Sequence, residues 1–221
     1  MEIKAATVME AWREAIRLIL AEGRIFTDDE SRESCELLNL TVTIESPSTA
    51  VEAVRAMRAY RKWIYPSEDE LANIVLNKDA LPNYDYLYGQ RIFDYDHALN
   101  QVDEYVIPLL QQRPNTRRAV VTLLNPLRDA RIGKKNFPSI SVISFRVIEQ
   151  RLCVTVFIRT SGFFTGWPAN VYQMSKLQEY VAHALALPRG PLTTISLSAH
   201  LHMDTLDDVE AVLGKGVAKR K

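Results

Sequence analysis

Apolar residues recur every three or four positions in four stretches of the chain, and this spacing predicts helices. The first stretch covers residues 7–23, where Val8 and Trp12 share one face and Gly23 follows as a stop signal. The other three stretches are residues 50–64, 98–112 and about 170–185. A tyrosine-rich loop at residues 82–91 is expected to lead into a further helix.

Strand signals alternate with these helices. Residues 37–47 alternate between apolar and polar side chains, as a half-buried strand does. Valine, isoleucine, threonine and other strand-forming residues dominate three later stretches, at 117–126, 140–160 and 191–203. Glu149 and Gln150 interrupt the second of these stretches and predict a hairpin. Helices and strands in this order predict one α+β domain that spans residues 1–221.

The composition narrows the class of protein. With 221 residues, of which 47% are hydrophobic and 24% charged, the chain is long enough to bury a full core. Its formal net charge is zero, so we expect no nucleic-acid partner. No apolar run reaches the ~20 residues of a membrane span and no signal-peptide pattern opens the chain, so we expect a cytoplasmic protein without a membrane partner. Cys35 and Cys153 lack a metal-ligand spacing and are interpreted as buried free thiols, and no metal site is expected.

Two pairs of residues have the chemistry to bind a phosphate. Arg117 and Arg118 stand together at a predicted strand start, where they would either fork around a phosphate or simply face solvent. Arg159 ends a strongly apolar strand and needs a partner for its charge, which a phosphate or a structural ion pair would supply. Thr160 adds a hydroxyl donor beside it. Neither pair alone distinguishes a ligand site from ordinary structure.

Two further features have the chemistry to bind a base and a sugar. Gly166 opens the segment Gly-Trp-Pro-Ala-Asn, which places Asn170 near a helix start, either as an N-cap or as an amide that reads the edge of a base. His200 and His202 lie two residues apart on a predicted strand, so their side chains share one face. Because no cluster of metal ligands accompanies them, hydrogen bonding to a ribose hydroxyl is a better interpretation than metal binding.

Taken together, these segments resemble the thymidylate synthase family. In chain order they read Tyr88-Gly89-Gln90-Arg91, Arg117-Arg118, Pro138-Ser139, Arg159-Thr160, Gly166-Trp167-Pro168-Ala169-Asn170 and His200-Leu201-His202. The family has the same order: YG..R, an arginine pair opening a strand, Pro-Cys before a hairpin, a strand ending in Arg-Ser, a G.P.N helix start and a final H.Y strand. The resemblance runs from about residue 8 to residue 210 and is closest to the short archaeal-type members.

The resemblance implies a fold and a reaction. The fold would be a mixed sheet with flanking helices, two copies of which pack sheet to sheet as a homodimer. The reaction would transfer a one-carbon unit, methyl or hydroxymethyl, from 5,10-methylenetetrahydrofolate to C5 of a pyrimidine nucleotide monophosphate, with dUMP as the first choice.

By position, the resemblance also assigns the phosphate site. Arg159 and Thr160 would hold the nucleotide phosphate, and Arg32, in the loop before the first predicted strand, would be a further ligand. Arg117 and Arg118 would reach across the dimer interface to the phosphate bound by the partner subunit.

The base, the sugar and the proton at C5 are assigned in the same way. Asn170, with Gly166 at the start of its segment, would read the pyrimidine ring; in the family, Asn at this position goes with uracil and Asp with cytosine. His200 and His202 would contact the sugar, but the family usually has Tyr at the second position, which leaves the choice between ribose and deoxyribose open. Tyr88 would belong to the network that serves removal of the C5 proton.

The family pattern breaks at the residues of the chemistry. Ser139 stands where the family has the cysteine that attacks C6 of the pyrimidine, and a serine hydroxyl is far less acidic and needs a partnered base. Ile140 follows it in place of a frequent histidine. Gly162 replaces the aspartate that binds the pterin, and Glu52 lies on the expected helix for the catalytic glutamate but out of clear register.

The nucleotide-binding positions match the family better than the catalytic and folate-binding positions do, and three hypotheses follow from this difference. The chain is a methyl- or hydroxymethyltransferase with Ser139 as an impaired or altered catalytic residue, or a diverged homologue that binds a pyrimidine nucleotide without folate chemistry. The third hypothesis is altered chemistry on a nucleotide in nucleoside biosynthesis. A cysteine deliberately exchanged for serine to trap a ligand would give the same residue at position 139.

Overall fold

The computed structural model of the chain describes residues 1–79, 87–134 and 136–218. Its strands are β1 (Glu2–Ala5), β2 (Arg24–Thr27), β3 (Glu33–Ile44), β4 (Val120–Thr122), β5 (Ile140–Ile148), β6 (Arg151–Ile158), β7 (Ser161–Gly162) and β8 (Arg189–His202). Its α-helices are α1 (Val8–Glu22), α2 (Ala50–Ala59), α3 (Glu68–Leu76), α4 (Tyr88–Phe93), α5 (Ile107–Gln112), α6 (Pro126–Asp129), α7 (Gly166–Ala184) and α8 (Leu206–Leu213). A π-helix, η2 (Gln101–Val106), precedes α5, and the 3-10 turns η1 (Pro47–Thr49) and η3 (Met203–Thr205) precede α2 and α8.

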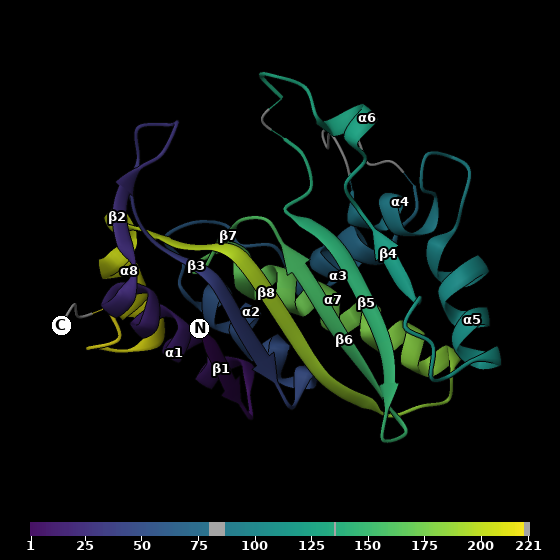
Figure 1. The fold of residues 1–221 in the computed structure, drawn as a ribbon. Helices are drawn as coiled ribbons and strands as arrows, with labels where there is room; N and C mark the ends of the chain where they lie inside the picture. The colour runs from purple at the N-terminus through teal and green to yellow at the C-terminus, as the bar shows by residue number, and fades with distance from the viewer. Residues whose placement is uncertain (80–86, 135, 219–221) are drawn as a thin grey trace.

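The strands form one mixed sheet, which confirms the predicted class of an α+β fold with flanking helices. Their order is β1-β3-β8-β6-β5-β4, with β2 paired to β3 and β7 paired to β8. The central strand β8 runs antiparallel to β3 and parallel to β6 and β7, while β5 and β6 form the predicted antiparallel hairpin. The carboxyl ends of β6, β7 and β8 and the start of β5 therefore meet at one edge of the sheet (Figure 1).

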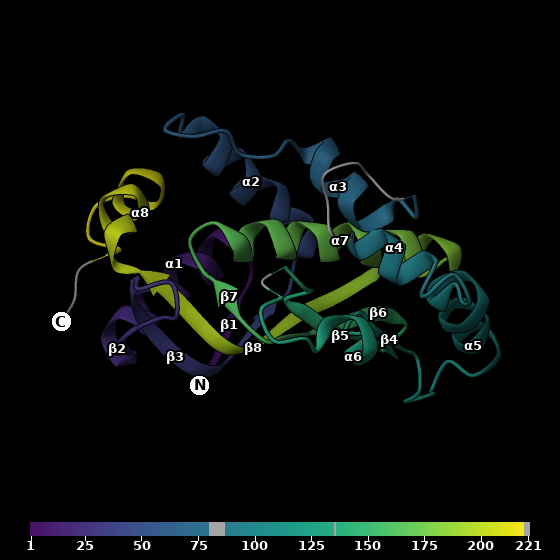
Figure 2. The same cartoon turned by 90° about the horizontal axis from the view of Figure 1, so that it is seen from above.

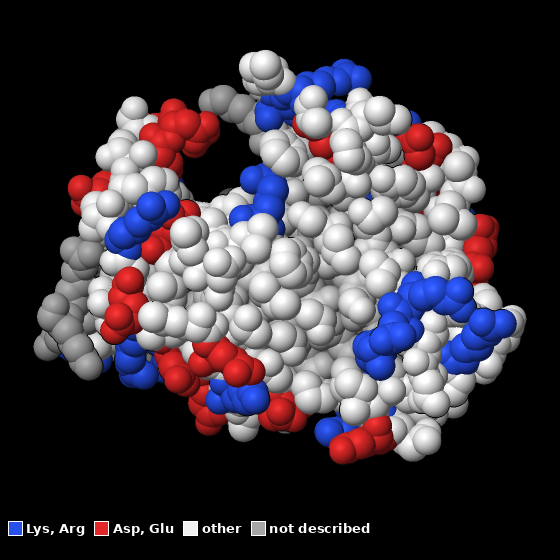
Figure 3. All heavy atoms as spheres, in the orientation of Figure 1, with Lys and Arg blue, Asp and Glu red and all other residues white. Residues whose placement is uncertain are grey.

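The helices cover one face of this sheet. Figure 2 shows α1 and α7 on that side, with α2 and α3 lying beyond α7. On the opposite face, apolar side chains such as Val142, Phe157 and Leu197 are exposed. Figure 3 shows that the centre of this open face carries no charged side chains. The chain thus buries the apolar residues of one sheet face only, in a layered arrangement.

Helix α1 shows how local sequence fixes this packing. Thr7 and Glu10 form a capping box at its start, because each side chain accepts a hydrogen bond from the other's backbone N–H. Trp12 is fully buried, and its indole N–H donates to the carbonyl of Phe163 at 2.6 Å. A Cβ at Gly23 would lie 2.3 Å from the carbonyl oxygen of Ile19, so only glycine fits where the helix ends. The predicted helix at residues 7–23 is confirmed.

The hairpin turn is also explained by its two residues. Glu149 and Gln150 have φ angles of 51° and 59°, the pair of positive values that a two-residue turn of type I′ requires. Such a turn matches the twist of the flanking strands, so it sets the register of β5 against β6.

Several predicted boundaries were wrong. The helix expected at residues 50–64 ends at Ala59, and the one expected from about residue 170 begins at Gly166, because Pro168 in the first turn needs no backbone donor. The expected strand at 117–126 is only β4, since the Asn125 side chain accepts a hydrogen bond from the N–H of Leu127 and caps α6. The region of residues 98–112 is helical, but its first half is the π-helix η2. Helices α3 and α8 were not predicted.

Part of the tyrosine-rich loop, residues 80–86, and the end of the basic tail, residues 219–221, lie outside the described residues. Within the described ranges, none of the helices is both long and apolar enough to pass through a bilayer.

Candidate functional site

The site lies at the sheet edge where β6, β7 and β8 end and β5 begins. Ser139 stands one residue before β5, and Arg159 and Thr160 follow β6 directly. The N–H of Arg159 donates to the carbonyl of Ser139 at 2.8 Å, which holds the two segments side by side. Gly162 in β7 pairs with His200 in β8, so these two strands bring their residues to the same edge as Ser139 and Arg159. The fold therefore brings together residues that are far apart in the sequence.

Ser139 is held by Tyr88, the first residue of α4. The two hydroxyl oxygens lie 2.8 Å apart, and Tyr88 is buried while Ser139 is only partly so. Tyr88 is the one hydrogen-bond partner of the Ser139 hydroxyl among the described residues. A phenol keeps its proton near neutral pH, so it is a poor base for activating a serine hydroxyl. The role of Tyr88 in removal of the C5 proton stays a prediction. Its hydroxyl lies beside that of Ser139, and no strong base next to Ser139 is found among the described residues.

Arg159 is oriented by neutral groups. Its Nε donates to the carbonyl of Pro138 at 3.1 Å and its Nη2 to that of Phe137 at 3.3 Å, and its guanidinium lies 4.0 Å from the centre of the Phe137 ring. Within the described ranges, no carboxylate pairs with it. The guanidinium charge is therefore positioned but not neutralised, as an anion-binding side chain requires.

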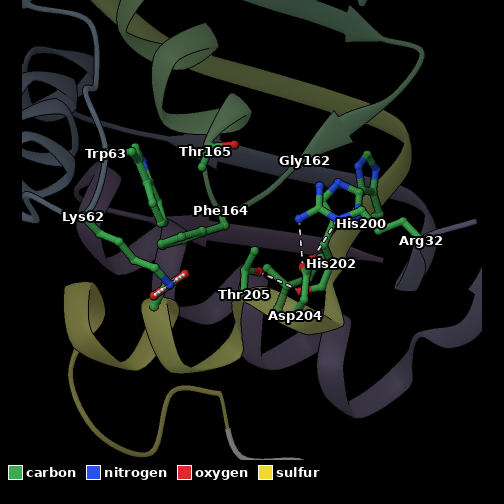
Figure 4. A pocket seen from close by; sticks show the side chains of 12 residues that line it. Arg32, Lys62, Trp63, Gly162, Phe164, Thr165, His200, His202, Asp204 and Thr205 are labelled. Atoms are coloured by element: carbon green, nitrogen blue, oxygen red, sulfur yellow. Dashed lines mark hydrogen bonds and ion pairs between the residues drawn. The ribbon is translucent and has the colours of Figure 1, made fainter. Parts of the chain in front are cut away.

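The two histidines form one wall of a pocket of about 390 Å³ (Figure 4). Their ring centres are 5.1 Å apart. Nδ1 of His200 lies 3.4 Å from the Thr160 hydroxyl, and Nδ1 of His202 lies 2.8 Å from the Ser34 hydroxyl. Gly162 completes this wall, because a Cβ built on it would lie 3.5 Å from Nε2 of His200. The pocket thus offers polar ring nitrogens fixed in place by hydroxyl groups.

Burial, and then the neighbouring His202, lower the pKa of His200 to about 4. Burial and the Arg32 charge likewise hold the pKa of His202 below its ordinary value. Both rings are therefore neutral near pH 7, and a neutral imidazole can donate one hydrogen bond and accept another, as a sugar hydroxyl demands.

This shift predicts an acid-sensitive fold. Because the folded-state pKa of His200 lies below the value of about 6.5 expected when unfolded, the unfolded chain takes up a proton first as the pH falls. We expect His200 to cost the fold about 2 kcal/mol of unfolding free energy between pH 7 and pH 5. Urea unfolding at both pH values would measure this loss, which His200→Gln should reduce and His183→Gln, at an exposed site in α7, should not. An equal loss in the His200→Gln chain would contradict it.

The rest of the pocket was not predicted from the sequence. Trp63 and Phe164 form an aromatic wall, with an edge-to-face contact at 5.9 Å between their ring centres. Arg32 and Lys62 line the pocket and are paired with Asp204 and Asp208. Arg32, which was predicted, thus lies at the site. Asp204 and Asp208 were not predicted, because the acidic segment after the last strand looks in the sequence like an ordinary solvent-exposed start of a helix.

Four predicted residues lie away from these contacts. Asn170 is in the second turn of α7 rather than at its cap, which is Thr165, and its amide has no hydrogen-bond partner among the described residues. Gly166 is the first residue of that helix. Arg117 and Arg118 are exposed before β4, and their side chains pair with no carboxylate in the described part of the chain. Figure 3 shows Lys and Arg side chains gathered near β4 and α5.

Three other expectations are settled in different ways. Glu52 is exposed in the first turn of α2 and makes no hydrogen bond to Ser139 or Tyr88. Cys35 is buried, as expected, and its thiol donates to the carbonyl of Ile19 at 3.1 Å. The same interpretation was wrong for Cys153, which is only half-buried because its position in β6 faces the open side of the sheet.

Comparisons with known proteins agree on one family. The thymidylate synthase family model matches residues 45–220. A protein of Methanosarcina mazei named "putative thymidylate synthase" is 31% identical over 97% of this chain and 95% of its own length. Proteins of the same name from Methanococcoides burtonii and Methanocaldococcus jannaschii are 32% and 26% identical, over 97% and 91% of this chain and 95% and 90% of their own lengths.

The mixed sheet with flanking helices fits the fold of this class of proteins. The chain belongs to the thymidylate synthase family.

Proposed function

We propose that the chain transfers a one-carbon unit from 5,10-methylenetetrahydrofolate to C5 of a pyrimidine nucleotide monophosphate, with dUMP as the substrate. One observation carries the proposal. At a single sheet edge the fold gathers a hydroxyl pair at the family's nucleophile position, an un-neutralised guanidinium and two neutral imidazoles. These are the groups that attack a ring, bind a phosphate and contact a sugar.

The nucleotide roles follow from the contacts. Arg159 presents its guanidinium for the phosphate, with Thr160 as a hydroxyl donor and Arg32 at the pocket wall. His200 and His202 offer ring nitrogens to the sugar hydroxyls.

The base is assigned to the start of α7. We assign the uracil edge to the Asn170 amide, which has no partner among the described residues. Gly166 borders open space, since a Cβ there would meet nothing within 4 Å, and we assign the same base to it. An amide can both donate to and accept from the polar atoms of uracil.

The pocket fits a reduced folate in part. Trp63 and Phe164 supply a flat apolar wall of the kind a pterin or aminobenzoyl ring stacks on. Gly162 offers no carboxylate to the pterin, and the nearby Asp208 is already bound by Lys62 and Tyr60. When bound, the folate supplies the one-carbon unit, and this chain's part is to stack its ring and keep water away from the pyrimidine.

A symmetric homodimer completes the proposal. The open sheet face exposes Val142, Phe157 and Leu197, and apolar surface of this kind favours burial against a second copy. Arg117 and Arg118 are exposed and have no carboxylate partner among the described residues, which suits a phosphate bound by the partner subunit. The described residues of one copy would then form one domain in a two-site assembly.

The test is the mass of the nucleotide recovered after the chain is incubated with dUMP and methylenetetrahydrofolate. A methyl or hydroxymethyl mass gain supports the transferase. Unchanged dUMP that nevertheless binds by calorimetry supports the second candidate, a homologue that binds pyrimidine nucleotides without folate chemistry. One observation favours that candidate. Among the described residues, the Ser139 hydroxyl is hydrogen-bonded only to Tyr88, whose phenol is a poor base for activating it.

The base assignment predicts a change of preference. With Asn170→Asp, a protonated carboxyl or a carboxylate replaces the amide, and either one presents an altered set of donors and acceptors to the ring. We expect the affinity for dUMP to fall at least about tenfold, because leaving polar base atoms unpaired costs this much or more. The affinity for dCMP should rise over the same titrations. Asn73→Asp, on the helix α3, serves as the control; an unchanged preference for dUMP in the Asn170→Asp chain would refute the assignment.

A further inference from the structure

The two cations that line the pocket, Arg32 and Lys62, are each paired with a carboxylate from the same short segment. Arg32 donates to Asp204 twice, from Nε to Oδ2 at 3.0 Å and from Nη2 to Oδ1 at 2.8 Å. Lys62 Nζ lies 2.7 and 2.8 Å from the two carboxylate oxygens of Asp208. Asp204 is in η3 and Asp208 in α8, four residues apart, and both line the pocket. Figure 4 shows Asp204 beside Arg32.

The two pairs differ in how freely they can open. The Asp208 side chain is only 7% exposed and also accepts a hydrogen bond from Tyr60, so it is fixed in the packing between α8 and the end of α2. The Asp204 side chain is 60% exposed and the Arg32 side chain 43% exposed. The Arg32–Asp204 pair can therefore separate without disturbing the core, whereas the Lys62–Asp208 pair cannot.

We propose that Asp204 is a built-in competitor for Arg32, so that Arg32 is released only to a ligand group that carries two negative charges, such as a phosphate monoester. The inference rests on the proposed function, which assigns Arg32 to the nucleotide phosphate. A carboxylate and a phosphate use the same planar fork of guanidinium donors, so the fork cannot be filled by both at once. A dianionic phosphate exceeds the single charge of Asp204 and displaces it.

The charges of the pocket support this role. With both histidines neutral, its two cations and two carboxylates balance, so the empty pocket does not attract anions in general. Asp204 thus lowers the affinity for anions and raises the selectivity among them. Arg32 adds no binding free energy for a nucleoside without a phosphate, and little for a singly charged group, which only replaces the carboxylate already present.

The test is Asp204→Asn, which keeps the size of the side chain and removes its charge. Calorimetry would compare dUMP, 2′-deoxyuridine and inorganic phosphate on the full chain. We expect dUMP and inorganic phosphate to bind about fivefold more tightly, because an exposed ion pair no longer has to be broken, and 2′-deoxyuridine to bind as before. Asp207→Asn makes the same charge change on an exposed residue that does not line the pocket, and should have little effect. Combined with Arg32→Gln, the gain from Asp204→Asn should vanish.

Several results would overturn the inference. Unchanged or weaker binding of dUMP by the Asp204→Asn chain would mean that Asp204 orients Arg32 or plays no part. An equal gain for 2′-deoxyuridine would show that the effect does not act through the phosphate. If dUMP binds to neither chain, the proposed function fails, and inorganic phosphate alone decides: the fivefold gain would keep the competitor role, and its absence would end it.

Discussion

Replacing Ser139 with cysteine is expected to yield a chain that adds a methyl or hydroxymethyl mass to dUMP at least about 100-fold faster than the serine form, with methylenetetrahydrofolate present. A thiol is partly ionised near neutral pH, whereas a serine hydroxyl is not, and the only described partner of the hydroxyl is Tyr88. The neighbouring Arg159 charge, which no carboxylate among the described residues neutralises, would favour the thiolate further. Mass spectrometry of the recovered nucleotide over time measures the two rates.

The control for this experiment is Ser139→Ala, which removes the hydroxyl and should bind dUMP about as well as the serine chain while giving no product. If the cysteine chain leaves dUMP unchanged, the transferase proposal fails in favour of a nucleotide-binding homologue, and Gly162 becomes the first residue to examine for lost folate binding. If the serine chain turns over as fast as the cysteine chain, a different nucleophile or mechanism must act.

Removing the carboxylate of Asp129 is expected to lower the free energy of unfolding by about 3–5 kcal/mol, because it leaves the buried Arg91 charge unpaired. Asp129 accepts hydrogen bonds from Arg91 Nη1 at 3.1 Å and Nη2 at 2.8 Å, and from the N–H of Asn125 at 2.8 Å. Burial alone would raise the pKa of Asp129, but the Asn125 N–H, Arg91 and Lys134 outweigh it and hold the pKa below its ordinary range. The carboxylate therefore stays ionised and stabilises the fold at neutral pH.

Urea unfolding of Asp129→Ala measures this loss. Asp96→Ala is the matched control: it breaks the pair with Arg128, in which both side chains are about half exposed, and should cost no more than about 1 kcal/mol. A loss as small for Asp129→Ala would refute the prediction. Arg91 belongs to α4, which also carries Tyr88, and Asp129 belongs to α6, so this pair joins the helix of Tyr88 to the helix that precedes Ser139 in the chain.

The sequence indicated the residues of the proposed nucleotide site far better than the pocket walls around them. Arg159, Thr160, His200 and Ser139 were expected because each belongs to a short motif whose neighbours fix its place at a strand end. Hydrophobic spacing found α1 and the β5–β6 hairpin, since Gly23 and the turn at Glu149 mark their limits in the sequence itself.

The other walls of the pocket and helix α8 could not be predicted from short stretches of sequence. Trp63 and Phe164 lie about a hundred positions apart, and only tertiary packing shows that their rings meet. The pairing of Arg32 with Asp204 joins residues 172 positions apart in the same way. Helix α8 went unpredicted because its eight residues are too few for a clear period, and tertiary contacts such as that between Asp208 and Lys62 stabilise it.

The central place of β8 decides which wall of the site can adapt to a ligand. Its fourteen residues pair with β3, β6 and β7, so its backbone amides belong to the part of the chain that opens last in local unfolding. His200 and His202 stand on this strand and behave as a fixed template, whereas Arg32 is on a loop beside the sheet and Asp204 on the segment after it. In the proposed site, Arg32 and Asp204 can therefore adjust to different nucleotides. A change of sugar preference would instead require substitution of His200 or His202, because the β8 backbone that carries them is rigid.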